Sequence, residues 1–251
     1  METTQLFRDL PRFYHQWAPL TWCLGFLEAP LSVVETTILP WMGATRGRIE
    51  VARVEGNTAE FFARLPPLTG MPARVMWCTT QSNWIAYVDS GYRGSSPSAP
   101  LGYLSRAIGC RGVVATCVPH TLVGSGKVAK GAYGAVQLEL LGPKPTTEGG
   151  LNCLRSISVA RDAGRKWAFC ESGQRLSFEE TDNYDTPDVR QRFTPDMLVR
   201  YCSNFGIELY DRAFYGPDAY ILDFLDVARS KEWSLDAAKQ ALLIASSEPA
   251  F

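Results

Sequence analysis

The side chains that could act as nucleophiles, bases or metal ligands are few in this sequence and widely spaced. The chain has two histidines, His15 and His120, and seven cysteines without a CxxC pair. A zinc site needs ligands at characteristic spacings, so we expect neither a metal nor another cofactor. Cys117 and His120 are a thiol and a base close in sequence, but catalytic pairs of this kind usually meet through the fold.

Two carboxylates occupy matching positions in two similar segments. Asp89 lies in Ala86–Gly91 and Glu171 in Ala168–Gly173, and the segments share three identical residues and two conservative replacements. We expect each carboxylate to stand at the end of a strand and to accept hydrogen bonds from the following loop. The alternative is a symmetric pair of carboxylates that flanks a pocket.

Motifs for nucleotide binding, metal binding and hydrolysis are missing. Gly124–Lys127 resembles a phosphate-binding loop, but Thr121 replaces the first glycine of that motif and Val128 replaces its hydroxyl residue. No Gly-x-Ser-x-Gly or His-Glu-x-x-His sequence occurs. The sequence leaves open a hydrolase with a site between two repeat units, built from Asp89, Cys117, His120 and Glu171.

The most unusual stretch runs from Glu171 to Asp196. It holds seven carboxylates against three arginines, with aromatic residues between them. The simplest interpretation is a solvated loop. The functional one is an acidic docking surface, because such a surface speeds association with a basic partner and aromatic residues supply anchors. Its contacts would be Glu179, Glu180, Asp182, Tyr184, Asp185 and Asp188.

Composition excludes several classes of protein. The chain has 251 residues, 46% of them hydrophobic, and a net charge of −1, which excludes a disordered chain and argues against a dedicated nucleic-acid binder. Seven cysteines in mostly apolar contexts favour free thiols in a reducing cytoplasm. Phe13–Leu27 is uncharged but is shorter than the about 20 residues of a membrane span, so we expect a core-facing helix and turn. No signal peptide is visible, and we expect no membrane partner.

Secondary-structure patterns predict one compact α+β domain over residues 1–251. An N-terminal subregion, 1–70, contains a strand at Gly47–Val54 and a helix capped by Asn57. Ala135–Leu141 is a further strand. C-terminal helices, 217–247, would begin at Pro217 and Ser234.

Two copies of one hairpin–helix–strand unit are expected to form most of an antiparallel sheet with helices packed on it. The first, 73–118, has strands at Arg74–Thr79 and Asn83–Asp89, a helix at Pro100–Gly109 and a strand at Gly112–Cys117. The second, 155–212, has strands at Arg155–Ala160 and Lys166–Glu171, a helix capped by Thr194 and a strand at Ile207–Tyr210.

Two segments, Ser82–Gly91 and Arg192–Leu198, resemble uncharacterised bacterial proteins of the toxin-immunity type. The resemblance covers about Arg74–Tyr215, and its motifs are structural. It implies a cytoplasmic inhibitor that binds a cognate toxin, and it assigns no site residue.

Three functions therefore compete. The first is a non-enzymatic immunity protein, a monomer or small homo-oligomer, whose acidic loop binds a basic toxin domain in place of nucleic acid. The second is the hydrolase without a motif. The third is a structural or assembly subunit with an oligomer interface made of Phe7, Phe13, Trp22 and Trp41.

Overall fold

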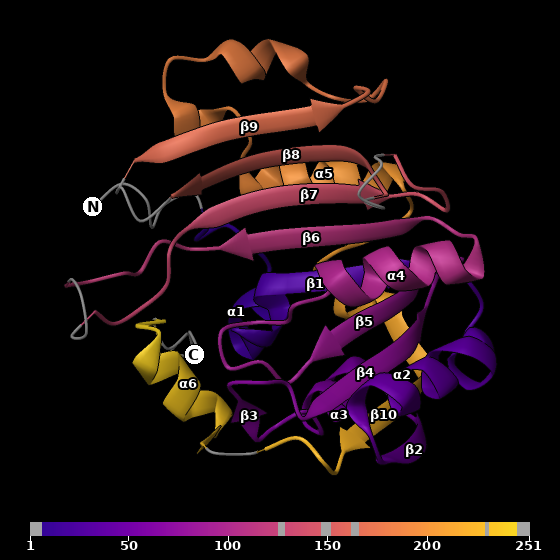
Figure 1. Ribbon diagram of the computed structural model, residues 1–251. Helices are drawn as coiled ribbons and strands as arrows, with labels where there is room; N and C mark the ends of the chain where they lie inside the picture. The colour runs from indigo at the N-terminus through magenta and orange to yellow at the C-terminus, as the bar shows by residue number, and fades with distance from the viewer. Residues whose placement is uncertain (1–6, 125–128, 147–151, 162–165, 229–230, 245–251) are drawn as a thin grey trace.

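The computed structural model describes residues 7–124, 129–146, 152–161, 166–228 and 231–244 (Figure 1). Its centre is a nine-stranded sheet in the order β2-β10-β4-β5-β1-β6-β7-β8-β9, and neighbouring strands pair antiparallel throughout. The predicted α+β class with a mainly antiparallel sheet is therefore confirmed. The strands are β1 (Cys23–Leu27), β2 (Ile49–Glu55), β4 (Arg74–Thr80), β5 (Ile85–Asp89), β6 (Gly112–Val118), β7 (Ala135–Leu141), β8 (Cys153–Arg161), β9 (Trp167–Gly173) and β10 (Tyr215–Phe224).

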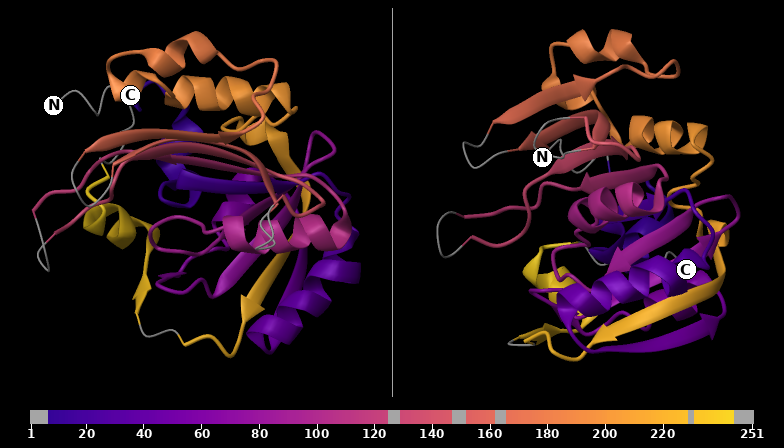
Figure 2. Two further views of the ribbon diagram at one scale, coloured as in Figure 1. Left: turned by 45° about the horizontal axis from the view of Figure 1, so that its top comes forward. Right: turned by 45° about the vertical axis from the view of Figure 1, so that its right-hand side comes forward.

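Helices cover both faces of this sheet and create two hydrophobic cores. Figure 2 shows one group of helices on each side of the curved strands. The larger core contains side chains from α1 and α5, and the smaller core contains side chains from α2 and α4. The helices are α1 (Arg12–Trp17), α2 (Leu39–Arg46), α3 (Thr58–Phe62), α4 (Ser98–Ile108), α5 (Pro195–Asn204) and α6 (Leu235–Ala241), and a small second sheet pairs β3 (Leu68–Thr69) with β11 (Glu232–Trp233).

Several local predictions are confirmed because they rest on short-range chemistry. Asn57 forms a capping box at α3, and Thr194 and Ser234 cap α5 and α6 with their hydroxyl oxygens. β7 begins and ends at the predicted residues, where buried and half-buried side chains alternate. The hairpins β4–β5 and β8–β9 also lie where they were expected.

The predicted helix at Pro217 is wrong. Residues Tyr215–Phe224 form β10, which pairs with β2 on one side and β4 on the other. Because both faces of β10 are covered, Ile221 points into the larger core and Leu222 into the smaller one. The resulting apolar run has no alternation of the kind that identifies a strand. Pro217 is exposed where the pairing register shifts, a position that tolerates proline.

Two other assignments need correction. Phe13–Leu27 is not only helix and turn, because its last five residues form β1, which pairs with β5 and β6 in the middle of the sheet. Ile207–Tyr210 is a turn that follows α5 and not a strand. The segment 1–70 contributes β1 and β2 to the same sheet as the two expected repeats.

The two expected repeats share a hairpin followed by a helix, but they differ beyond that. The second lacks its final strand, and the helices pack on opposite faces of the sheet. Leu101 of α4 lies in the smaller core, whereas Leu198 of α5 lies in the larger core. The internal duplication therefore stays a prediction.

Candidate functional site

The acidic stretch after β9 is a packed part of the larger core. It contains two short 3-10 helices, η4 (Thr181–Asp185) and η5 (Val189–Gln191), and runs between β9 and α5. Tyr184 and Phe193 are buried in the core together with side chains of α5. Tyr184 lies 5.1 Å, between ring centroids, from Phe169 of β9. The solvated-loop interpretation is therefore wrong for the inner side of this segment.

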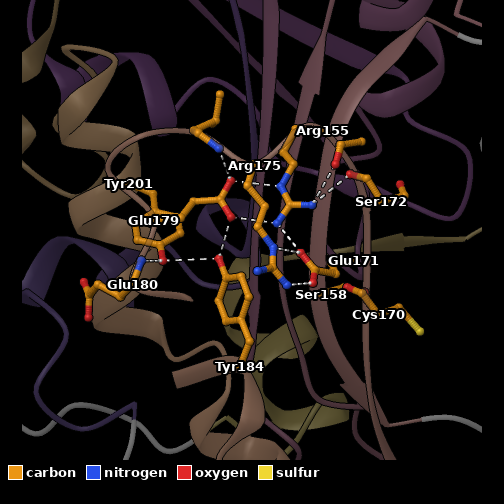
Figure 3. A network of polar contacts seen from close by, with 12 residues as sticks. Arg155, Ser158, Cys170, Glu171, Ser172, Arg175, Glu179, Glu180, Tyr184 and Tyr201 are labelled. Carbon is orange, nitrogen blue, oxygen red and sulfur yellow. Dashed lines mark hydrogen bonds and ion pairs between the residues drawn. The ribbon is translucent and has the colours of Figure 1, made fainter. Parts of the chain in front are cut away.

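A buried arginine fixes the segment to the sheet (Figure 3). The side chains of Arg155, on β8, and Glu179 are 1% and 0% exposed. The guanidinium donates from Nε to Glu179 Oε1 at 2.9 Å and from Nη2 to Glu179 Oε2 at 2.7 Å. Nη2 also reaches Glu171 at 2.5 Å, and Nη1 donates to the carbonyl oxygens of Ser172 and Gly173. Two parallel N–H···O bonds of this kind hold the Arg155 and Glu179 side chains in one fixed arrangement.

Two tyrosines complete the network around Glu179. The Tyr184 hydroxyl donates to Glu179 Oε2 at 3.0 Å, and the backbone N–H of Leu176 donates to Oε1 at 2.8 Å. The Tyr201 hydroxyl, from α5, accepts from the Glu180 N–H at 2.6 Å and lies 3.2 Å from the Tyr184 hydroxyl. Every oxygen of the buried Glu179 carboxylate therefore has a donor.

Charge states follow from these contacts. Burial by itself would lower the pKa of Arg155, but its bonds to Glu179 and Glu171 raise that pKa overall. Arg175, assisted by Arg155, holds the pKa of Glu171 below its ordinary value. The network therefore carries a permanent cation between two carboxylates.

The six predicted partner-binding residues separate into three groups. Glu179 and Tyr184 are buried, which corrects their expected role as exposed contacts. Glu180 and Asp188 form ion pairs with Arg200 and Arg190 at 2.7 and 2.8 Å. The other two carboxylates are exposed and have no ion-pair partner in the part of the chain that the structure describes; they are Asp182 and Asp185.

A third such carboxylate lies next to them. Asp196 is exposed in the first turn of α5 and also lacks a cationic partner among the described residues. The Asn183 amide of η4 contacts the Met197 sulfur at 4.0 Å, which places the two segments side by side. We call Asp182, Asp185 and Asp196 the acidic surface.

Asp89 and Glu171 do not flank a common pocket. β5 and β9 are separated by β1, β6, β7 and β8. Five strand spacings of about 4.8 Å place them about 24 Å apart across the sheet. The symmetric-pair interpretation is therefore wrong.

Asp89 organises the loop after β5, as expected. Its carboxylate accepts from the backbone N–H of Gly91 at 3.0 Å and of Ser96 at 2.9 Å, and from the Tyr87 hydroxyl at 2.9 Å. Burial raises the pKa of Asp89 above its ordinary value. Glu171 differs, because its oxygens bind arginine side chains and not the loop backbone.

Cys117 and His120 are not arranged as a nucleophile and its base. Cys117 lies inside the larger core, where burial raises the pKa of its thiol to about 12. The Tyr14 hydroxyl donates to the backbone carbonyl oxygen of Cys117 at 2.9 Å. Because the thiolate is the reactive form, this cysteine does not act as a nucleophile near neutral pH.

Thiol labelling tests this placement. We expect a maleimide at neutral pH to modify the exposed Cys170 first and to leave Cys78, Cys117 and Cys202 unmodified until the protein unfolds. Peptide mapping by mass spectrometry identifies the labelled residues, and Cys170→Ser is the control that removes the fast step. Rapid labelling of Cys117 in the folded protein would contradict the structure.

Cavities and metal ligands do not single out a catalytic centre. Four surface cavities have volumes of 390–430 Å³, and none is lined by Asp89, Cys117, His120 or Glu171. Within the described ranges, no three His, Cys, Asp or Glu side chains gather as metal ligands do. None of the helices seen there is both long and apolar enough to cross a membrane.

The aromatic residues assigned to an oligomer interface are mostly internal. Phe7, Phe13 and Trp22 are buried in the larger core. Trp41 is half-buried and stacks on Tyr103, with ring centroids 4.8 Å apart. This correction removes the surface on which the assembly-subunit hypothesis depended.

Sequence reasoning missed Arg155 and Tyr201. A signal for Arg155 was present in the sequence. Alternate residues of a strand point to the same face, so Arg155 lies on the same face as Ile157 and Val159, whose side chains enter the core. A charged residue on the buried face of a strand requires a buried partner. The sequence does not tell which carboxylate that partner is.

Comparisons of this chain with protein-family models, with curated proteins and with solved structures find no significant match.

Proposed function

We propose that this protein is a non-enzymatic inhibitor of the immunity type, which binds a basic toxin domain through the acidic surface. One observation carries the proposal. The segment that holds Asp182 and Asp185 is anchored by the buried Arg155–Glu179 pair, while these carboxylates and Asp196 face solvent and form no ion pair with any described residue.

Anchoring matters because flexible loops lose conformational entropy when they bind. A segment that is already fixed avoids much of this cost, so its contacts contribute more to affinity. Unpaired carboxylates steer a basic partner and raise the association rate. A toxin that grips phosphate with lysine and arginine offers a matching surface.

Location and repeat structure are part of the same proposal. All seven cysteines are free, which suits a reducing cytoplasm. We retain the duplication of 73–118 and 155–212 as a hypothesis on the shared hairpin and following helix.

Charge reversal tests the proposed surface. The tagged protein is used to isolate a basic polypeptide recovered in near-equal amount, and the two purified proteins are then compared by calorimetry. We expect Asp182→Lys, Asp185→Lys and Asp196→Lys together to weaken binding by at least about tenfold, with a larger effect at about 50 mM than at about 200 mM salt.

A matched control reverses three exposed carboxylates elsewhere, through Glu50→Lys, Glu55→Lys and Asp236→Lys. This variant has the same net charge as the first, so it separates the local surface from overall charge. Equal affinities of the two variants would overturn the acidic surface as the interface. Failure to recover any such partner would contradict the proposed inhibitor.

A further inference from the structure

The end of β8 and the start of β9 lie side by side at one end of the sheet (Figure 1). Four side chains gather there. The Arg155 network lies at the opposite end of the β8–β9 hairpin, since Arg155 pairs with Gly173 and Arg161 pairs with Trp167. The members of this cluster are His120, Tyr133, Arg161 and Trp167. None of them belongs to the acidic surface.

Gly134 holds the cluster together. Its N–H donates to His120 Nδ1 at 3.3 Å, and its carbonyl oxygen accepts from the Arg161 backbone N–H at 2.9 Å. A Cβ at this position would lie 2.5 Å from Trp167 and 2.8 Å from His120. The absence of a side chain at Gly134 therefore allows the His120 imidazole and the Trp167 indole to pack directly against its backbone.

The hydrogen bond from Gly134 defines the tautomer of His120. A neutral imidazole that accepts at Nδ1 carries its proton on Nε2. Nε2–H is therefore a donor. The ring centroid lies 6.0 Å from that of Trp167 and 6.3 Å from that of Tyr133, which is 42% exposed.

Arg161 brings a cation to the same place. Its Nε is buried and has no hydrogen-bond partner among the residues that the structure describes. No ion pair joins Arg161 to a carboxylate in the described part of the chain. A buried guanidinium N–H without an acceptor is unfavourable, and few such groups persist in folded proteins unless an ion, a water or a ligand satisfies them.

We propose that His120 and Arg161 form a binding site for an oxyanion, a phosphate-type dianion or a carboxylate, with Trp167 and Tyr133 as its walls. Both polar members donate, and one is a permanent cation, so the site suits an acceptor with several oxygens. A metal cation is disfavoured by the positive charge of Arg161.

The electrostatics of His120 agree with this geometry. Burial lowers the pKa of His120, and the positive charge of Arg161 lowers it further. Arg161 from β8 is the charged group that acts on the ring, while Tyr133 and Trp167 face it from the chain before β7 and from β9. A bound anion offsets the charge of Arg161, so it raises the pKa of His120.

The two histidines make this directly measurable by proton NMR. The imidazole signals of His15 and His120 are followed over pH in sulfate, in acetate and in chloride at equal ionic strength, and His120→Gln assigns them. We expect sulfate or acetate, but not chloride, to raise the pKa of His120 while His15 is unchanged. A single small oxyanion bound by two side chains should have a dissociation constant of about a few millimolar.

Variants of Arg161 test whether its guanidinium binds the anion that raises the pKa of His120. Arg161→Gln should weaken binding by at least about tenfold, because it removes a charge-assisted donor. Arg161→Lys should keep part of the binding, and Arg212→Gln, at an exposed arginine elsewhere, should keep all of it. Circular dichroism verifies that each variant is folded.

Each outcome has a defined meaning. A response to sulfate identifies a phosphate-type ligand, and a response to acetate alone identifies a carboxylate ligand. Equal shifts in chloride, or in Arg161→Gln, would overturn the site. The charge-reversed Asp182, Asp185 and Asp196 variant should bind the anion normally, so this test is independent of the proposed toxin partner.

Discussion

Arg155→Met is expected to lower the free energy of unfolding by about 3–5 kcal/mol, because it leaves Glu179 charged and buried without its cation. The Glu179 side chain is 0% exposed and cannot recover water without moving the whole segment. Urea unfolding followed by circular dichroism measures the change as a lower midpoint at unchanged slope.

Two further variants show how much of the destabilisation comes from the burial of the ion pair and how much from leaving one charge unpaired. Arg200→Met removes the surface partner of Glu180, where the arginine side chain is 53% exposed, and should cost no more than about 1 kcal/mol. Arg155→Met combined with Glu179→Met should destabilise by less than the sum of the single changes, since it removes both charges. Purely additive effects would show that the pair is not coupled as the structure indicates.

Asp89→Ala should destabilise the fold by about 3–5 kcal/mol. It removes the acceptor for the Gly91 and Ser96 N–H groups and the Tyr87 hydroxyl, and each orphaned buried donor costs about 1–3 kcal/mol. Urea unfolding again gives the magnitude. Asp89→Asn keeps one carbonyl acceptor and should lose clearly less stability.

The difference in the free energy of unfolding between wild type and Asp89→Asn is expected to depend on pH. Burial raises the pKa of Asp89 above its ordinary value of 3.8, so the folded state holds this proton more tightly than the unfolded state. Its contribution to stability is complete below about pH 4 and is lost as pH rises through the folded pKa. The stability difference between wild type and Asp89→Asn should therefore shrink as the pH rises above about 4, and a widening difference would contradict the raised pKa.

Predictions from sequence succeeded where one face of an element or one cap determined the structure. β7 alternates as far as Leu140 because its inner side chains, such as Leu138, enter the larger core, and Leu141 at its end packs into the smaller core. Asn57 and Thr194 bond to backbone N–H groups two or three residues away, so their role depends on nothing distant.

The failures came from contacts between distant parts of the chain. β10 reads as helix because proline precedes an apolar run, and only pairing with β2 and β4 makes it a strand. The acidic stretch reads as solvated because its counterions, Arg155 and Arg200, lie outside it. Composition identified an excess of carboxylates, but not which of them were already neutralised.

The position of β10 also constrains how the protein emerges from the ribosome. Within the described ranges β2 pairs with β10 alone, and β4 needs β10 for its second edge, yet β10 begins at Tyr215. Until Tyr215–Phe224 has been synthesised, the nascent chain therefore carries open edges on β2 and β4. Such edges template pairing with other chains, so closure of the sheet more than 130 residues after β4 makes the growing polypeptide a client for chaperones until β10 is inserted.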